Sequence, residues 1–425
     1  MELVNLEKEE FIEFSKNFPN SMFFQSPNWI NVKKDNGWTG EMIGLKENGE
    51  VKAATILLYK RVQFIRRNMV YAPRGFLLDY NNLELLSLFV SKVKEYLKSK
   101  KALFLKINPY VIYQEHDING EVIEGTKNDK VIGKLKELGF KHQGFYITMD
   151  DKKDLEPRWL SVLNIKDKTS DELFKNMRST TRWSIRNSEK NSLKIIECKK
   201  EDLKEFKALM QHTADRREFT DRPLSYYENM YDSLINDNLV KVLLVEINFK
   251  ELLDKTKKEF NDLTSKIEKI KDNLKREGEL KELESQIPSF EKRIKDLEDY
   301  KEEYGDSKII AGGLYMLYGR QLVYLFGASY KDFMKYNSQY LLQWEMIKYA
   351  IENKYDTFNF YGIDGDFSKE SKNFGLIDFK RGFGCDIIEL IGEFDLVLNK
   401  PLYKLYRFLF KIYQSLKRVK AKIHK

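Results

Sequence analysis

The feature that most constrains this chain is a pair of heptad-patterned segments between residues 250 and 300. Apolar residues recur there at alternating spacings of three and four, and the pattern stops and restarts around Gly278. The pattern runs through Leu253, Thr256, Phe260, Leu263, Ile267, Ile270 and Leu274, then Leu280, Leu283, Ile287, Phe290, Ile294 and Leu297. Two such helices, each about 24 residues or roughly 36 Å long and joined by the turn 276–279, predict an antiparallel helical hairpin. Pro288 is expected to kink the second helix.

The charge of this hairpin, which we place at 247–305, is nearly balanced. It contains fourteen basic and sixteen acidic residues. A balanced surface favours a solvated spacer or an arm that docks a partner, such as a second copy in a homodimer, over a phosphate clamp. Contact with nucleic acid remains the alternative interpretation of the arm.

Outside the hairpin, strand-like and helix-like segments alternate along the chain. In the first part we expect strands over 51–62 and 102–107 and a helix over 83–98. Later, a capping-box pattern at 169–172 opens a helix that we extend to about residue 190. The remaining expected elements are strands over 239–247, 309–316, 322–326 and 357–361 and a helix over 338–353. This alternation predicts an α/β or α+β protein with domains at 1–150 and 151–395.

The C-terminal segment carries the excess charge of the chain. Residues 402–425 hold eight Lys or Arg and no acidic residue, which equals the net charge of +8 of the whole chain. One helical stripe contains Leu402, Leu405, Tyr406, Leu409, Ile412, Tyr413, Leu416, Val419 and Ile423. This pattern is typical of a helix at an anionic lipid interface. Packing of 396–425 on the first domain and contact with tRNA are the alternatives.

Several classes of protein and site are excluded by absences in the sequence. No apolar run reaches the length of a membrane span, and the acidic first ten residues do not resemble a signal peptide. Cys198 and Cys385 form no Cys-x-x-Cys pair, and the four histidines have no metal-binding spacing. No nucleophile elbow, phosphate loop or dinucleotide fingerprint is present. The residues alone therefore predict a cytoplasmic two-domain protein without a structural metal.

A set of polar and aromatic motifs adds a resemblance. They read FQSPNWINVK at 24–33, YAPRGFLLDY at 71–80, NMRSTTRWSIR at 176–186, TADRREF at 213–219, RPLSY at 222–226, FKRGFG at 379–384 and IGEFD at 391–395. In this order and spacing, over about 20–400, the chain resembles the FemABX family of peptidoglycan bridge-forming aminoacyltransferases, including the position of the inserted hairpin.

The resemblance implies a fold, a reaction and a location. The fold would be two acetyltransferase-like (GNAT-like) domains facing a shared cleft, with the hairpin projecting from the second. The reaction would move an amino acid from aminoacyl-tRNA to a stem-peptide amine of lipid II or UDP-MurNAc-pentapeptide, without metal or coenzyme A. The enzyme would be cytoplasmic, with peripheral contact at the inner face of the plasma membrane. Two other readings stay open: a transferase for another amine acceptor, and a non-catalytic tRNA- or membrane-binding coiled-coil adaptor.

The resemblance also assigns a phosphate site to three residues. Lys33 and Arg222 fall where the family binds the phosphates of the precursor, and Tyr226 lies one helical turn after Arg222. A point-charge lysine and a forked arginine suit a pyrophosphate. Without the surrounding motifs, both cations would be read as ordinary surface residues.

Phe379 and Lys380 match the Phe-Lys pair beside the reaction centre of the family. Aminolysis of an ester passes through a tetrahedral oxyanion, which a fixed ammonium stabilises. Lys380 is therefore the predicted catalytic residue. The alternative is a solvated lysine at the end of a strand.

The chain departs from the family at Asn108, in the sequence Ile107-Asn108-Pro109. Some family members carry there an aspartate that is proposed to receive the proton of the amine, and an asparagine cannot act as a base. Asn108 is expected either to hydrogen-bond the acceptor peptide or to end the strand in a turn.

Two further groups of residues have open interpretations. Alternation along a strand would send Tyr324 and Phe326 to one face, to stack on substrate or to pack in the core. Arg178, Arg182 and Arg186 would form one ridge on a helix, for tRNA or a lipid headgroup, or else a solvated face.

Overall fold

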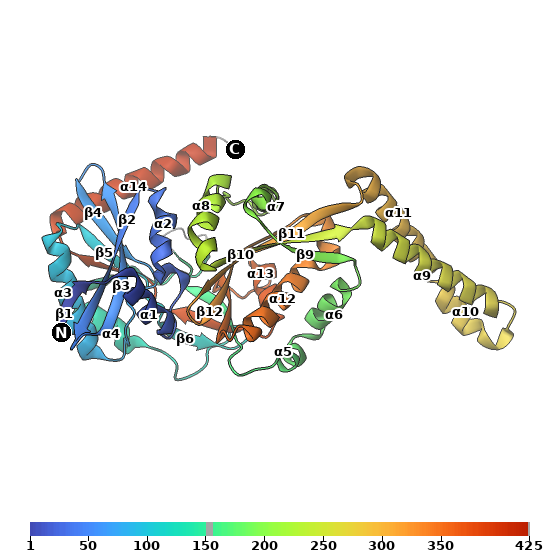
Figure 1. The fold of residues 1–425 in the computed structure, drawn as a ribbon, viewed down its shortest axis with the longest axis horizontal. Coiled ribbons are helices and arrows are strands. Elements are labelled where there is room, and N and C mark those ends of the chain that lie inside the picture. The colour runs from blue at the N-terminus through green and yellow to red at the C-terminus, as the bar shows by residue number, and fades with distance from the viewer. Residues whose placement is uncertain (150–155, 424–425) are drawn as a thin grey trace.

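A computed structural model describes residues 1–149 and 156–423, with side chains placed as far as residue 412 (Figure 1). The part of the predicted basic stripe beyond residue 412 lies outside the described side chains. Two sheets with their helices lie side by side, and a long helical arm projects from the second one. The predicted mixed α/β class with an inserted hairpin is thus confirmed.

The first sheet has seven strands in the order β1-β2-β3-β4-β5-β15-β7. Their bounds are Glu2–Asn5, Trp38–Glu47, Glu50–Val62, Arg67–Ala72, Phe104–Ile107, Phe394–Val397 and Phe140–His142. Neighbouring strands are antiparallel except for β4 and β5. The long strand and the helix predicted over 51–62 and 83–98 are present as β3 and as α3, Leu83–Ser99.

The second sheet has eight strands in the order β6-β14-β8-β13-β12-β11-β10-β9. Their bounds are Ile112–His116, Asp386–Leu390, Trp159–Asn164, Thr357–Ile363, Gln321–Ser329, Ser307–Tyr318, Val240–Asn248 and Leu193–Glu197. All four strands predicted in this part are present, and only β12 and β13 pair in parallel.

The sheets exchange strands, so residue 150 does not separate them. Strand β6 comes from the first part of the chain but pairs with β14 in the second sheet, and β15 inserts between β5 and β7 of the first. A core cluster that joins Phe24 and Trp29 to Tyr227 and Leu314 also crosses the boundary. A local sequence pattern identifies a strand but does not identify the strand that pairs with it. The exchange of strands between the sheets could therefore not be predicted from the sequence.

The remaining helices of the two domains connect and cover these sheets (Figure 1). They are α1 (Lys8–Asn17), α2 (Pro27–Lys34), α4 (Asp129–Glu137), α5 (Ser170–Asn176), α6 (Ser179–Ser188), α7 (Leu203–Arg217), α8 (Leu224–Leu234), α12 (Ser338–Glu352) and α13 (Phe374–Arg381).

The single helix predicted from residue 170 to about 190 is wrong, because α5 and α6 are separate helices. The predicted capping box of Thr169 and Glu172 opens α5. Met177 and Arg178 are then extended, and the Arg178 N–H donates to the Gly382 carbonyl (2.9 Å). A backbone hydrogen bond to a segment two hundred residues away thus ends the first helix.

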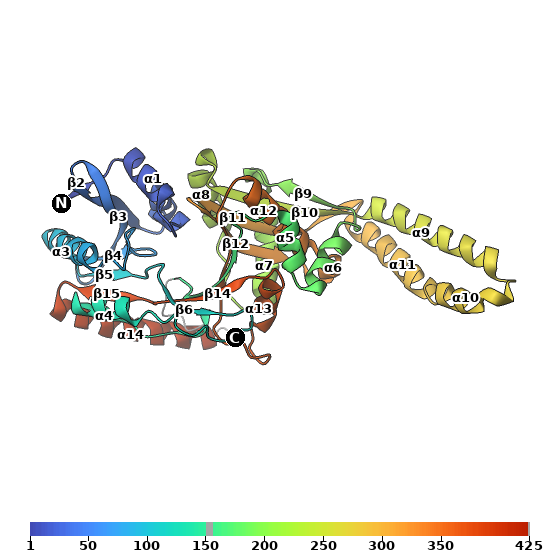
Figure 2. The ribbon, with the colours of Figure 1, turned by 90° about the horizontal axis from the view of Figure 1, so that it is seen from below.

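The arm is an antiparallel pair of helices, as predicted (Figure 2). It consists of α9 (Phe249–Ile270), α10 (Glu277–Glu284) and α11 (Ile287–Tyr304). The turn precedes α10, and Gly278 lies within this helix, so the turn predicted at 276–279 is misplaced. Pro288 produces a break rather than a kink, because it occupies the first turn of α11, where its missing N–H leaves no hydrogen bond unmade.

The C-terminal helix α14 (Lys400–Ile423) packs on the first sheet through its first turns, as one of the alternatives predicted. The Tyr403 ring lies 5.2 Å from that of Phe104, and its hydroxyl donates to Asp395 (2.7 Å). None of the helices in the described residues is both long and apolar enough to cross a membrane.

Candidate active site

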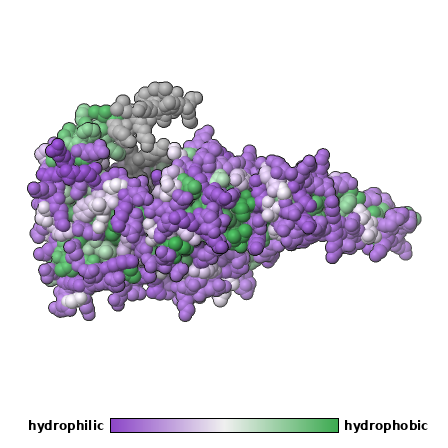
Figure 3. Space-filling view, turned by 45° about the horizontal axis from the view of Figure 1, so that its top comes forward, coloured by the Kyte–Doolittle hydropathy of each residue, from purple (hydrophilic) through white to green (hydrophobic). Residues whose placement is uncertain are grey.

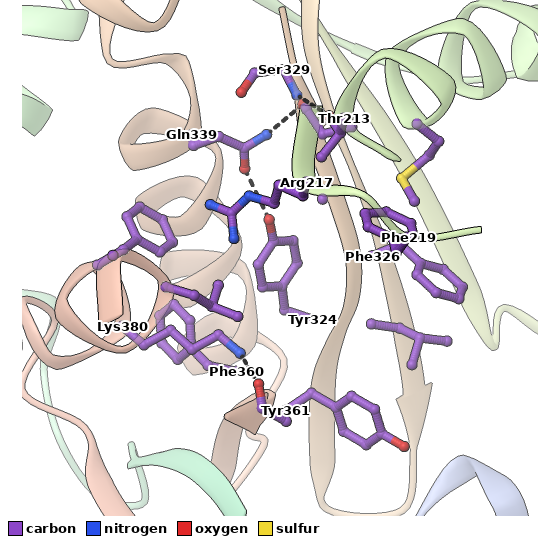
Figure 4. Close-up of a pocket in the computed structure, with 18 of the residues that line it drawn as sticks. Thr213, Arg217, Phe219, Tyr324, Phe326, Ser329, Gln339, Phe360, Tyr361 and Lys380 are labelled. Carbon is purple, nitrogen blue, oxygen red and sulfur yellow. Dashed lines mark hydrogen bonds between the residues drawn. The ribbon is translucent and has the colours of Figure 1, made fainter. Parts of the chain in front are cut away.

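The second domain contains a cavity of about 590 Å³ between its sheet and helices α7, α12 and α13 (Figure 4). Most of its wall is apolar or aromatic, with a few polar groups converging on the interior. Its lining includes Arg217, Tyr324, Gln339, Phe379 and Lys380. A concave apolar pocket with convergent polar groups is the usual form of a small-ligand site.

Lys380 enters this cavity from the last turn of α13, not from a strand end. Its side chain is 4% exposed, and its ammonium donates to the Gly362 carbonyl (2.7 Å). Burial, together with the nearby charge of Arg217, lowers the pKa of the Lys380 ammonium to about 7, against a smaller opposing effect of Cys385. Near neutral pH, Lys380 therefore exists in both protonation states. The alternative of a solvated lysine is wrong, because the side chain is buried.

Phe379 holds α13 against α12 through aromatic contacts. Its ring lies 5.0 Å from that of Tyr340 on α12 and 5.4 Å from that of Phe383. Such edge-on contacts restrict both rings. Phe379 thus lines the cavity and fixes the turn of helix that carries Lys380.

Tyr324 and Phe326 both line the cavity but lie on opposite faces of β12, contrary to the prediction. The register with β11 shifts between Leu314 and Tyr315, so that Leu325 is an extra residue. Tyr324 therefore packs in one core cluster and Phe326 in the other, and Figure 4 shows them on the two sides of the strand. A β-bulge interrupts the alternation on which the prediction depended.

Tyr324 is held by an amide that spans the sheet. Its hydroxyl donates to Gln339 (3.0 Å), and the amide of Gln339 donates to the carbonyls of Gly312 (3.0 Å) and Ala328 (2.7 Å). The Tyr324 ring is consequently fixed beside Lys380 and Arg217 (Figure 4).

Lys33 and Arg222, 189 positions apart in the sequence, meet at the boundary of the two domains. Lys33 lies on α2 with its ammonium 4.7 Å from the centre of the Trp29 ring. Burial lowers the pKa of Lys33, and the charge of Arg222 lowers it further, whereas Glu156 raises it. Arg222 also lines the cavity of Lys380. The fold therefore brings Lys33 within electrostatic reach of Arg222, and Arg222 shares a cavity with Lys380.

Two amides fix this pair by joining α2 to α8. The Asn28 side chain donates to the Ser233 carbonyl (2.8 Å), and that of Asn229 donates to the Val32 carbonyl (3.2 Å). Tyr226, in the first turn of α8, places its ring 5.3 Å from the Arg222 guanidinium. The spacing of the two cations thus depends on the contact between the domains.

Asn108 lies outside the lining of the cavity and organises a loop. Its carbonyl oxygen accepts from the Tyr71 hydroxyl (3.0 Å) and from the Arg74 N–H (2.8 Å). Arg74 has a left-handed backbone (φ 57°), which costs a non-glycine residue energy. These bonds support the predicted turn. The buried amide nitrogen of Asn108 has no hydrogen-bond partner among the described residues.

The three arginines predicted to form a ridge are each engaged elsewhere. Arg178 pairs with Asp378 (2.7 Å), Arg182 donates to the carbonyls of Lys175 and Met177 (2.7 Å each), and the Arg186 guanidinium lies 5.2 Å from the centre of the Phe174 ring. Because α6 begins at Ser179, Arg178 is not on its regular face, and the three do not lie around the cavity.

Two residues that line the cavity were not predicted from the sequence. Arg217 lies inside a quoted motif, yet nothing in the sequence aims it at Lys380; within the described residues its guanidinium has no hydrogen-bond or ion-pair partner. Tyr361 has a left-handed backbone (φ 65°) at a register shift of β13, and its hydroxyl donates to Glu156. Such irregular strand positions have no signature in hydrophobic patterns.

A metal site is not evident in the part of the chain that the structure describes. There, no three His, Cys, Asp or Glu side chains are grouped to hold an ion. The charged side chains that line the cavity are Arg216, Arg217, Asp221, Arg222 and Lys380.

Comparison with known proteins identifies the relatives of this chain. Residues 6–411 match the FemAB family. The chain is 32% identical to the aminoacyltransferase FemA of Staphylococcus epidermidis over 97% of this chain and 100% of FemA, and 32% identical to FemA of Staphylococcus aureus over 97% and 99%. The crystal structure of FemX superposes with a TM-score of 0.78 at 33% identity, covering 95% of this chain and 99% of FemX. As the order of its motifs predicted, this chain belongs to the FemAB family, whose FemA members are aminoacyltransferases.

Proposed function

We propose that this aminoacyltransferase moves an amino acid from aminoacyl-tRNA to the stem-peptide amine of a peptidoglycan precursor, and so builds the interpeptide bridge. The acceptor would be lipid II or UDP-MurNAc-pentapeptide. The observation that supports this most is the adjacency of two sites. A buried lysine lies in a largely apolar cavity, and Arg222, one of two cations suited to a pyrophosphate, lines the same cavity.

In this proposal the acceptor amine attacks the ester carbonyl carbon of the donor. Negative charge then develops on the carbonyl oxygen, and Lys380 in its protonated form stabilises it. The intermediate collapses to an amide, and the ribose hydroxyl of the tRNA leaves with a proton. The aromatic wall formed by Phe379, Tyr324 and Phe360 excludes water, which would otherwise hydrolyse the ester.

The acceptor is proposed to be anchored by Lys33 and Arg222 through its pyrophosphate, with Tyr226 supporting the arginine. Lipid II and UDP-MurNAc-pentapeptide both contain a pyrophosphate, so this site is compatible with either acceptor. Neither a metal ion nor coenzyme A enters the proposed reaction.

The C-terminal helix is proposed to contact the anionic inner face of the plasma membrane, where lipid II would be met. Its basic residues and exposed apolar side chains support this placement. The arm is proposed as a docking element, with a second copy of the chain as its first candidate partner.

Offering the purified protein a panel of charged tRNAs with lipid II or UDP-MurNAc-pentapeptide tests the proposal. Mass spectrometry should show one added residue on the stem peptide, and the Lys380→Met variant serves as the blank. Product on a peptide N-terminus but on neither precursor would support the transferase with another amine acceptor. Binding of tRNA without product on any acceptor would support the non-catalytic adaptor.

A further inference from the structure

Helix α14 has three distinct faces along its described turns. At about 100° per residue, Leu402, Tyr403 and Tyr406 share the face that packs on the first sheet. The four cations of this stretch fall within about 60° of one another on a second face, and they are Lys400, Lys404, Arg407 and Lys411. A third face is apolar and exposed, and it consists of Leu405, Phe408, Leu409 and Ile412.

The exposed face is unusual for a helix that is already packed on a domain. Phe408 is 61% exposed, and the surface next to the grey atoms at the upper left of Figure 3 is correspondingly hydrophobic. The stripe predicted from sequence is thus divided between two faces. One half is covered by the sheet, and the other half has no cover among the described residues. A contiguous exposed apolar surface of this kind marks an interaction site.

The hairpin between β3 and β4 continues this surface. Val62 at the end of β3 and Ile65 in the turn pack in the same cluster as Leu402 and Tyr406, and the Tyr406 hydroxyl is 4.0 Å from the sulfur of Met69 on β4. Arg407 instead points toward the β7 edge of the sheet, where it donates to Gln143 (2.9 Å) just after β7. The exposed apolar face of α14 therefore borders the hairpin rather than β7.

The tip of this hairpin carries the most exposed aromatic side chain in the described residues. Phe64 is 89% exposed. It is flanked by two cations on each side, Lys60 and Arg61 before it and Arg66 and Arg67 after it. An exposed phenylalanine between cations is a costly arrangement in water, and it suits an interface that is apolar below and anionic above.

The charges favour a lipid surface over other partners. Residues 60–67 and 400–412 contain eight cations and no acidic residue. Arg67 also donates to the Lys101 carbonyl (3.1 Å), which brings two further lysines, Lys100 and Lys101, to the hairpin. Nucleic acid would use the cations but not the aliphatic side chains Leu405, Leu409 and Ile412, whereas an anionic bilayer uses both.

We propose that the β3–β4 hairpin, with Phe64 at its tip, is a second membrane-contact element that forms one lipid-docking surface together with the exposed face of α14. The inference rests on the proposed contact of α14 with the membrane and extends it. A single helix lying on a bilayer is free to rotate about its axis. A second contact beside it removes this freedom and gives the first domain a fixed orientation on an anionic surface.

Fluorescence at position 64 tests insertion directly in the full-length protein. The native Cys198 and Cys385 are buried, so a thiol-reactive, environment-sensitive dye can be placed on Phe64→Cys. Vesicles of phosphatidylglycerol and phosphatidylcholine should shift its emission to the blue, whereas phosphatidylcholine alone should not. The control is Trp183→Cys on α6, where the native side chain is 62% exposed and lies outside the proposed surface. Equal responses at the two positions would overturn the proposal.

Co-sedimentation with the same vesicles measures the energetic contribution. We expect Phe64→Ser and Phe408→Ser each to weaken binding by about tenfold, and Trp183→Ser to leave it unchanged. Circular dichroism checks folding, and transfer to the soluble UDP-linked acceptor should stay intact in Phe64→Ser. If Phe408→Ser weakens binding and Phe64→Ser does not, the hairpin is excluded and the α14 contact stands.

Two other outcomes would also count against the inference. If the wild-type protein binds neither kind of vesicle, the hairpin and the proposed α14 contact fail together, whatever the transfer assay shows. If Phe64→Ser loses tRNA binding but keeps vesicle binding, the surface binds tRNA and its assignment as a lipid-docking surface is wrong.

Discussion

Lys380 and the cations of α14 use positive charge in opposite ways. Lys380 stands in an apolar cavity, almost fully buried, with a pKa lowered to about 7. Along 400–412, four cations lie on one exposed face and the stretch contains no acidic residue, although Arg407 pairs with Asp395 (3.8 Å). Solvent and salt screen exposed charges but hardly reach a buried one. The effect of a buried charge therefore depends on where it lies, whereas the effect of exposed charges depends on how many of them there are.

Lys33 and Arg222 lie between these extremes. Lys33 is partly buried and Arg222 is exposed, they come from different domains, and the contact of α2 with α8 lies beside them. Each is expected to matter more than one cation of α14 and less than Lys380.

Lys380→Met should have the largest effect, because it removes the buried cation that is proposed to stabilise the oxyanion. We expect transfer to fall at least about a thousandfold while the fold persists, since Met fits the same buried space. Single-turnover rates with saturating donor measure this loss. The matched control is Lys369→Met, an exposed lysine just before α13. Turnover close to that of the wild type would refute the assignment of Lys380.

Arg222→Ala should come next. Loss of a charge-assisted pair to phosphate raises KM for the precursor by about ten- to a hundredfold, with a smaller change in kcat. Lys33→Ala should act in the same direction, and Arg222→Lys should restore part of the affinity. Arg276→Ala, at the far end of the arm, is the control. An unchanged KM in Arg222→Ala would remove the phosphate role.

The pH dependence separates the two protonation states of Lys380. Above a pKa of about 7 the ammonium is lost, so a role that needs its charge weakens as pH rises. Arg at this position stays protonated, and deprotonation of the acceptor amine is common to both enzymes. The ratio of wild-type to Lys380→Arg rates should therefore fall by about tenfold per pH unit above 7. A ratio that rises instead would make Lys380 the proton acceptor.

A single cation of α14 should have a modest, salt-sensitive effect. Lys404→Gln should weaken binding to anionic vesicles about fivefold at low salt, and this difference should vanish at high salt because the charge is exposed. Lys281→Gln on the arm provides a lysine of similar exposure for comparison. A large effect of Lys404→Gln that persists in high salt would contradict the view that the exposed cations of α14 act together and that no single one is decisive.

Asn108→Ala should have the smallest effect on transfer. Its loss leaves the buried Arg74 N–H without an acceptor, which lowers the free energy of unfolding by about 1–3 kcal/mol, while the cavity of Lys380 is untouched. Chemical denaturation measures the stability, and steady-state rates below the unfolding transition measure the activity. Strong loss of transfer without loss of stability would assign the free amide of Asn108 to the acceptor peptide.

Most of the fold that could be predicted followed from the regular spacing of apolar residues. The heptads of the arm specified its antiparallel pairing, and even the polar Thr256 fits, because its hydroxyl donates to the Leu252 carbonyl (2.7 Å) within the helix. Irregular backbone did not show in the sequence. The break at Met177, the extra residue Leu325 and the left-handed Tyr361 depend on segments far away in the chain, and they decide where Arg178, Phe326 and Glu156 lie.

The sequence by itself determined the family, the arm and the concentration of charge at the C-terminus, and the family resemblance made Lys380, Lys33 and Arg222 candidate site residues. These follow from the order and spacing of residues along the chain, which can be read without the fold. Only the tertiary structure decided that Lys380 is buried, that Arg217 shares its cavity, that the sheets exchange β6 and β15, and that part of the apolar stripe of α14 up to residue 412 is exposed. Burial, pKa and surface exposure depend on which distant segments pack together, and this information is absent from any local pattern.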